Sequence, residues 1–266
     1  MKCSGPAPWR VLSGTGIKVA GVILMTADHL HQMFIAQGAP GWLGWFGRPV
    51  AAMFLFLCAE GFYYTRDKRR YMLQLLGGFL LMTAMNRILS IAMPMEDVNL
   101  INNIFGTLFM AAFYMWILDR FRAGLKEKSP AKILSAIGGF LLPLLVSLAL
   151  LLALQATNRT AALILMFIPN PLFVEGGFIL VFMGTLFYAL RNYRIAQAAL
   201  ILAIGAVSWY TASDAGDVQW LMVFAVIPLF LYNGKRGKGG KYFFYIFYPA
   251  HIYLLYCAAW FLQGIA

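Results

Sequence analysis

Two histidines and an aspartate lie close together in the first apolar stretch of the sequence, within residues 25–32. In a helix, Asp28 and His31 share a face because they are three residues apart, whereas His29 points about 100° away from Asp28. A carboxylate can orient an imidazole, and the imidazole can then act as a base or a nucleophile. We therefore predict that Asp28 and His29 are catalytic. A polar cluster that holds helices together is the alternative.

A third histidine, His251, lies near the middle of the last apolar stretch, two residues after Pro249. A proline inside a helix removes a backbone hydrogen bond and favours a kink, which is one way to shape a cavity. Tyr248, three residues before His251, faces the same way. His251 is therefore a candidate functional residue beside such a cavity, with a structural hydrogen bond between helices as the alternative.

Ionisable groups elsewhere in the apolar stretches are also expected to have a partner or a function, because lipid solvates charge poorly. Glu60 precedes Gly61, which allows another helix or a ligand to come close, and an ion pair with Arg66 is its structural alternative. Arg87 requires an anion or a water-filled cavity, and Asp28 is one candidate partner. Glu175 fits a position at the outer interface.

A basic segment, Arg66-Asp67-Lys68-Arg69-Arg70-Tyr71, follows the second apolar stretch. Arginine and lysine side chains hold phosphate groups well, so the segment is a candidate phosphate-binding loop. Taken alone, it is more typical of a loop that stays on the cytoplasmic side of a membrane. The glycine-rich basic segment 234–240 lacks the spacing of a nucleotide-binding P-loop and is predicted to be a loop between spans.

The amino-acid composition indicates the class of protein in which these residues lie. Of 266 residues, 62% are hydrophobic and only 12% are charged, and the mean hydropathy is +0.74. A soluble domain is about one quarter charged, so soluble, disordered and coiled-coil classes are excluded. The sequence predicts an all-α, polytopic membrane bundle. The three cysteines, Cys3, Cys58 and Cys257, have no CxxC spacing, and no metal is expected.

Apolar segments long enough to cross a bilayer set the predicted architecture. An additional short stretch, Ala161–Ile168, runs into Pro169-Asn170-Pro171 and is expected to be re-entrant or interfacial. The chain has no internal repeat, so we predict one transmembrane domain over residues 1–266. The nine predicted spans are Ile17–Ala36, Val50–Tyr64, Tyr71–Met93, Asn103–Phe121, Ile133–Leu154, Phe173–Leu190, Ile195–Thr211, Trp220–Tyr232 and Tyr242–Leu262.

Lysine and arginine are distributed unevenly among the loops between these spans. Loops rich in basic residues alternate with poor ones along the whole chain, which predicts a cytoplasmic N-terminus and a C-terminus outside. This pattern explains most of the net charge of +11, so no nucleic-acid partner is expected. The rich segments are 2–18, 66–70, 120–132, 191–194 and 235–241.

The motifs at both ends of the chain resemble the TraX family, which is named for the F-pilin acetylase of conjugative plasmids. The middle of the chain, about residues 120–215, resembles the family only as apolar spans. Where that family often has Asp-Tyr-Gly, this chain has Glu175-Gly176-Gly177, which leaves the role of Glu175 open. The matching motifs are Asp28-His29, Gly47-Arg48-Pro49, Glu60-Gly61-Phe62 with Thr65-Arg66 and Tyr71, Leu231-Tyr232-Asn233-Gly234, and residues 244–251.

The resemblance implies a bacterial cytoplasmic-membrane enzyme that transfers acetyl groups from acetyl-CoA, in the founding case to the N-terminal amine of pilin. The layout also resembles membrane acyltransferases that acetylate sugars. It implies that His29 is the base, oriented by Asp28, and that His251 is a second proton carrier or an oxyanion donor. The acceptor stays open between a pilin-like peptide and a glycan.

The same resemblance assigns the remaining polar residues to the two substrates. The phosphates of CoA would reach the basic segment from the cytoplasm, and the acceptor would enter from the outer side. The expected CoA-binding residues are Arg66, Lys68, Arg69, Arg70, Tyr71, Glu60 and Tyr248, and the expected acceptor-binding residues are Arg48, Arg87, Asn102 and Asn103.

Two other functions use the same residues. A transporter or flippase would use the buried aspartate, histidine and arginine as a relay, and it would be expected to contain internal repeats. A non-catalytic membrane partner of a larger assembly would use them only to join helices, and it would not bind CoA.

Overall fold

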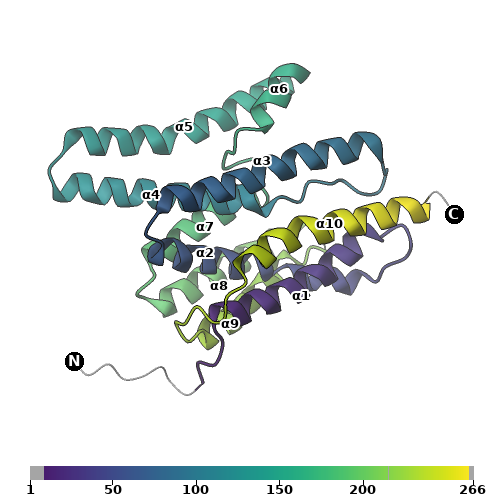
Figure 1. Cartoon of the computed structure of the whole chain (residues 1–266), viewed down its shortest axis with the longest axis horizontal. Coiled ribbons are helices and arrows are strands. Elements are labelled where there is room, and N and C mark those ends of the chain that lie inside the picture. Colours follow the sequence, from purple (N-terminus) through teal and green to yellow (C-terminus); the bar gives the residue numbers. More distant parts are fainter. Residues whose placement is uncertain (1–8, 215, 264–266) are drawn as a thin grey trace. The chain divides into compact units, whose positions relative to one another are not determined.

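The computed structural model describes residues 9–214 and 216–263, and this part of the chain is helical apart from loops and one isolated parallel bridge between Leu12 and Tyr232 (Figure 1). The predicted all-α class is confirmed. The elements are α1 (Gly14–Met33), η1 (Gly41–Gly47), α2 (Val50–Tyr64), α3 (Lys68–Ala92), α4 (Ile104–Lys126), α5 (Pro130–Gln155), α6 (Arg159–Met166), α7 (Gly177–Ala189), α8 (Arg194–Tyr210), η2 (Gln219–Ala225), α9 (Val226–Leu231) and α10 (Lys241–Gln263).

Every predicted span corresponds to helical structure, and α2 has the predicted bounds. The predicted span Trp220–Tyr232 differs, because it is divided into the 3-10 helix η2 and the short helix α9. Pro228 lies in the first turn of α9, where a proline is tolerated because its missing N–H has no helical partner there. The extra stretch forms α6, whose eight residues span only about 12 Å, too short to cross a bilayer.

Five segments are long and apolar enough to cross a membrane within the described residues. Three further apolar segments are shorter, at Gly177–Ala189, Arg194–Tyr210 and Gln219–Leu231. Helix α1 is 20 residues long, but Lys18, Asp28 and its two histidines lower its hydropathy. The model therefore confirms several candidate spans and leaves the count of nine as a prediction. The five segments are Gly41–Tyr64, Lys68–Ala92, Ile104–Lys126, Pro130–Gln155 and Tyr242–Gln263.

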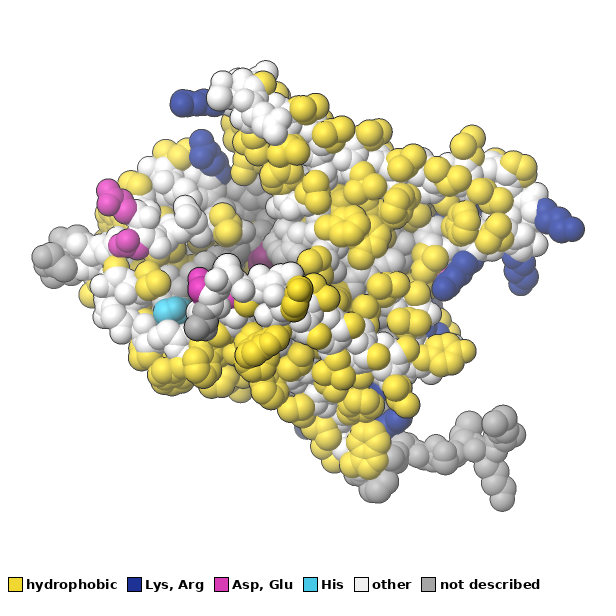
Figure 2. Space-filling model, turned by 180° about the vertical axis from the view of Figure 1, so that it is seen from behind, with side chains coloured by type: hydrophobic (Ala, Val, Ile, Leu, Met, Phe, Trp, Pro, Cys, Tyr) yellow, Lys and Arg dark blue, Asp and Glu magenta, His cyan; other side chains and the backbone are white. Residues whose placement is uncertain are grey.

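Large apolar side chains cover much of the visible surface in Figure 2, as expected for helices that face lipid. Helix α5 shows this clearly, because Leu134, Leu142 and Leu145 are each at least 60% exposed. A helix in water would bury such a stripe against a neighbour. These exposed faces support contact with a bilayer.

The chain packs as two compact units that interleave in sequence. The first consists of residues 1–57, 89–100 and 190–266, and the second of residues 58–88 and 101–189. Helices α2 and α3 each contribute to both units. The single domain over residues 1–266 stays a prediction.

The glycine-rich basic loop closes over the start of α1 in the first unit. The first N–H groups of a helix have no partner within the helix, and here Gly14 and Thr15 donate to the carbonyls of Lys235 and Arg236, at 2.8 and 2.9 Å. The Thr15 hydroxyl donates to the Lys238 carbonyl at 2.6 Å. Gly237 has φ +82°, and a side chain there would meet Ser13 and Thr15. The loop therefore caps α1 and joins it to the chain that enters α10.

Candidate functional site

Two buried histidines from opposite ends of the chain meet in the first unit. Nδ1 of His29, in α1, lies 2.8 Å from Nε2 of His251, in α10. The two side chains are 4% and 7% exposed. On its other side, Nδ1 of His251 lies 2.8 Å from the backbone carbonyl oxygen of Phe247. The structure thus brings together two of the three predicted catalytic residues.

These contacts assign the protons of a neutral pair. A carbonyl oxygen can only accept, so Nδ1 of His251 carries the hydrogen that it donates to Phe247. Nε2 of His251 then has a lone pair and accepts the hydrogen of Nδ1 of His29. Nε2 of His29 consequently carries a lone pair, which is the form that a base or a nucleophile requires.

Ring packing fixes the orientation of the His29–His251 pair. The His251 ring packs parallel to the Phe247 ring, with an interplanar angle of 12°. The two imidazole rings are close to coplanar, with an interplanar angle of 14°, and meet edge to edge through the nitrogen contact. Tyr248 packs edge-on against His251, with ring centroids 5.9 Å apart, and lies 6.5 Å from the His29 ring. Tyr248, predicted to contact the donor, therefore lies beside the histidine pair.

Asp28 is directed at a different partner from the one predicted. Its Oδ1 lies 3.4 Å from Nη2 of Arg48, which forms an ion pair with it. The reason is the helix itself, since neighbouring residues point about 100° apart. The His29 ring contacts His251, and the orienting role predicted for Asp28 stays a prediction.

Arg48 ties three elements of the first unit together. Its Nε donates to the Gly44 carbonyl at 3.1 Å, its Nη1 to Gln219 Oε1 at 3.4 Å, and its Nη2 to Asp28. The side chains of Arg48 and Asp28 are 36% and 21% exposed, so this ion pair contributes more to geometry than to stability. The acceptor contact predicted for Arg48 stays a prediction.

Close packing at two glycines explains how the segment Gly41–Gly47 approaches α1. A Cβ added at Gly47 would overlap the Asp28 carboxylate, and one at Gly44 would lie 3.0 Å from the His31 ring. His31 Nδ1 also lies 3.2 Å from the Ala39 carbonyl oxygen, so this histidine supports the turn that follows α1.

Gly47→Ala is expected to destabilise the protein by about 1–3 kcal/mol, because the Asp28 carboxylate must move away from the added methyl group. The measurement is thermal unfolding of the purified protein in detergent. Gly41→Ala is the matched control, since a Cβ at that glycine of the same 3-10 helix meets nothing within 4 Å. Equal unfolding temperatures for the two variants would contradict this packing.

The predicted CoA-binding residues of the basic segment lie in the second unit, at the start of α3. Asp67 Oδ1 accepts the backbone N–H of Arg70 at 2.9 Å and so caps the helix. Arg66, Arg69 and Arg70 are exposed, and their side chains form no ion pair with the described residues. Three guanidinium groups are therefore left to contact a ligand or solvent.

The other two residues predicted with this segment point into the protein. The Tyr71 hydroxyl donates to Cys58 Sγ at 3.4 Å and lies beside Gly61. Glu60 is buried, at 9% exposed. Their geometry fits packing at the end of α2, and their predicted contact with CoA stays a prediction.

The asparagines predicted to bind the acceptor have structural partners in the second unit. Asn103 Nδ2 donates to the Phe79 carbonyl at 3.0 Å, and Asn86 Nδ2 donates to the Asn102 carbonyl at 3.1 Å. Both predicted asparagines are 8% exposed. Arg87 is exposed on α3.

Glu175 has a role that the sequence left open. Its Oε2 accepts the Asn103 backbone N–H at 2.6 Å, and its carbonyl accepts the Thr107 hydroxyl at 2.5 Å. Gly176 and Gly177 follow with φ of +72° and +57°. In the sequence, an acidic residue followed by two glycines indicates a tight turn just before a helix.

No cluster of three or more histidine, cysteine, aspartate or glutamate side chains that could hold a metal occurs among the described residues. Cys58 and Cys257 are free thiols, and Cys3 lies outside the described residues. The chemistry of the candidate site therefore has to be derived from imidazole, carboxylate and guanidinium groups.

Comparison of the sequence with known proteins found one matching family and one curated relative. The family model described as TraX protein matches residues 13–258. A probable fimbrial assembly protein FimC, serogroup H1, from Dichelobacter nodosus is 27% identical over 264 residues, covering 93% of this chain and 96% of the relative. No solved structure matches significantly. The family match contains the histidine pair, Asp28 and Arg48.

Proposed function

Since the chain belongs to the TraX family, we propose that it is a membrane acetyltransferase that moves an acetyl group from acetyl-CoA to an amine or hydroxyl of a membrane-associated or extracytoplasmic acceptor. The observation that carries the proposal is the buried His29–His251 pair, whose contacts leave the lone pair of His29 on Nε2. A relative named as a probable fimbrial assembly protein makes a pilin-like peptide the first acceptor to test.

The proposed reaction uses His29 as the base. Nε2 of His29 takes the proton from the acceptor amine or hydroxyl as the acceptor attacks the thioester carbonyl. The carbon–sulfur bond then breaks, and the CoA thiolate takes a proton, which restores the neutral pair. His251 stabilises the imidazolium that forms on His29, because it accepts the hydrogen of His29 Nδ1.

The proposed topology brings the two substrates from opposite sides. Nine spans with a cytoplasmic N-terminus place the basic segment 66–70 in the cytoplasm, where Arg66, Lys68, Arg69 and Arg70 would hold the CoA phosphates. Arg48 and Arg87 would lie toward the outer side and receive the acceptor. In the second unit, Tyr71 and Glu60 are proposed for the donor, and Asn102 and Asn103 for the acceptor. In the first unit, Tyr248 is proposed for the donor beside the histidine pair.

The decisive experiment supplies radiolabelled acetyl-CoA to the purified protein in native-lipid nanodiscs, with membrane extract as the source of acceptor. We expect release of free CoA and transfer of label to one acceptor species, which mass spectrometry then identifies. Label that stays on the protein and is lost with hydroxylamine would indicate an acetyl-histidine intermediate. Acetyl-CoA consumption no faster than with heat-inactivated protein would rule the activity out and favour a relay transporter.

A further inference from the structure

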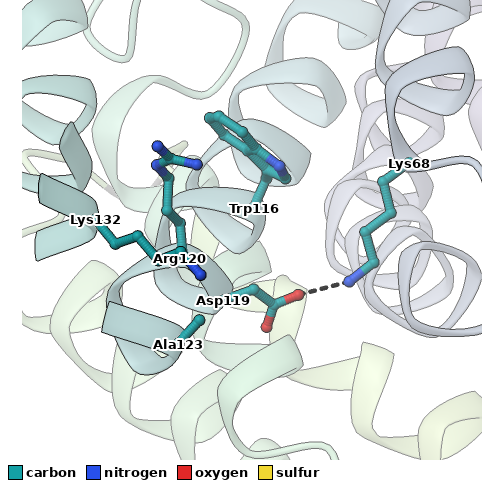
Figure 3. A pocket seen from close by; sticks show the side chains of 6 residues that line it. All are labelled: Lys68, Trp116, Asp119, Arg120, Ala123 and Lys132. Carbon is teal, nitrogen blue, oxygen red and sulfur yellow. Dashed lines mark hydrogen bonds and ion pairs between the residues drawn. The ribbon is translucent and has the colours of Figure 1, made fainter. Parts of the chain in front are cut away.

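A cleft of about 300 Å³ lies between the ends of three helices in the second unit (Figure 3). Lys68 reaches it from the first residue of α3, and Lys132 from the first turn of α5. Its lining residues are Lys68, Trp116, Asp119, Arg120, Ala123 and Lys132. Three cations and one carboxylate make the cleft basic, and only Lys68 among these residues belongs to the motifs found in the sequence.

The carboxylate of Asp119 forms an ion pair with Lys68, so it offsets the charge of this lysine and holds its ammonium in place. Asp119 accepts a hydrogen bond from the Lys68 ammonium at 2.5 Å and from the Tyr188 hydroxyl at 2.8 Å. The same ammonium lies 4.6 Å from the centroid of the Phe62 ring. Because three neighbours hold Lys68, its position is fixed before any ligand arrives, which lowers the entropy lost on binding.

Arg120 supplies donors at the other side of the cleft. Its Nε donates to the Ser135 hydroxyl at 2.5 Å, and an arginine has five N–H groups, so four remain for a ligand. Lys132 is paired with Glu127 at the rim. The net positive charge that faces a ligand thus comes mainly from the Arg120 guanidinium, whose planar fork suits phosphate.

Trp116 provides an aromatic surface beside these donors. The Arg120 guanidinium carbon lies 5.7 Å from the Trp116 ring centroid, and Figure 3 shows the two side chains next to each other. An aromatic ring next to phosphate donors is the combination that binds a nucleotide, because the base stacks while the phosphates are neutralised. A lipid headgroup would use the cations alone.

We propose that this cleft binds the phosphorylated adenosine end of an acyl-CoA donor, that is, an adenine nucleotide with phosphate groups on its ribose. The adenine would stack on Trp116, and the phosphates would lie between Arg120 and Lys68. This assignment rests on the proposed function, which needs such a donor, and it extends the donor site from the basic segment to α4 and α5.

The test is titration of the full chain, in phosphatidylcholine nanodiscs, with adenosine 3′,5′-bisphosphate by isothermal calorimetry. Arg120→Gln and Trp116→Leu are each expected to weaken binding by about tenfold or more, from loss of charge-assisted hydrogen bonds and of stacking. Arg122→Gln is the matched control, because Arg122 is exposed on the same helix and does not line the cleft. It should change the affinity less than about twofold. Trp116→Leu should leave the affinity for inorganic pyrophosphate unchanged.

Three results would overturn the proposal: no binding of the bisphosphate, equal losses for Arg120→Gln and Arg122→Gln, or an anionic lipid bound through Arg120 that the nucleotide does not displace. Thermal unfolding of each variant controls for folding, and Trp116→Leu keeps the test valid if Arg120→Gln is unstable. Acetyl transfer with normal affinity in both cleft variants would exclude only this cleft. Nucleotide binding without acetyl transfer would exclude only the proposed function.

Discussion

Replacing His29 by alanine is expected to lower the rate of acetyl transfer by about a thousandfold or more. General-base catalysis contributes about 10² to 10⁴ in rate, and His29 is the residue whose Nε2 carries the lone pair. The measurement is the initial rate of labelled product formation at saturating acetyl-CoA. Binding of the donor should be retained, because the alanine removes the base and leaves the basic segment intact.

His31→Ala is the matched control for this prediction. His31 lies on the same helix two residues away, and its Nδ1 contacts the Ala39 carbonyl oxygen and not the histidine pair. We expect it to keep the activity within about tenfold of the unchanged protein, with any loss arising through stability. A His29→Ala protein that folds and retains more than one tenth of the activity would show that another group is the base.

The second large effect is expected at His251, which acts through His29. His251→Phe keeps a ring in the stack with Phe247 but removes the acceptor for the Nδ1 hydrogen of His29. His29 is then no longer held in the tautomer with the lone pair on Nε2, and a wrong tautomer in a comparable site costs orders of magnitude in rate. We expect kcat to fall about a hundredfold, with little change in the KM for acetyl-CoA.

Rescue separates this positioning role from simple packing. The amide oxygen of His251→Gln can accept the same hydrogen, so this variant should recover about tenfold of the activity lost in His251→Phe. Phenylalanine fits the ring stack better than glutamine does, so a packing role predicts the opposite order. Activity that is higher in His251→Phe than in His251→Gln would therefore refute the proposed relay.

Most of the fold follows from local properties of the sequence. Long apolar runs separated by basic or glycine-rich segments predict where helices begin and end, and Val50–Tyr64 was predicted with its observed bounds. The span from Trp220 to Tyr232 was less regular than predicted. A proline near the middle of an apolar run leaves its hydropathy unchanged but alters the hydrogen bonding of the turn before it.

The partners of the site residues were less predictable, because they depend on distant parts of the chain. Spacing identified Asp28, His29 and His251 as unusual, yet it assigned Asp28 to His29 and did not pair Asp28 with Arg48. The direction of each side chain on α1 disfavours the first pairing, and the packing of Gly47 on Asp28 favours the second. Arg120 was noted only as part of a basic loop and Trp116 not at all, since an aromatic residue and an arginine near a helix end are typical of a membrane interface.

The distance between the two histidines in the sequence also determines how late in synthesis the pair can form. His29 and His251 are 222 positions apart, and at about 5–20 residues per second the ribosome needs roughly 10–45 s to make the second after the first. Helix α10 must then pack against α1 and against the residue that follows α3, where the Tyr256 hydroxyl donates to the Met93 carbonyl at 2.7 Å. A nascent chain that stops before this helix is made contains His29 without His251, so the histidine pair can form only after nearly the whole chain has been synthesised.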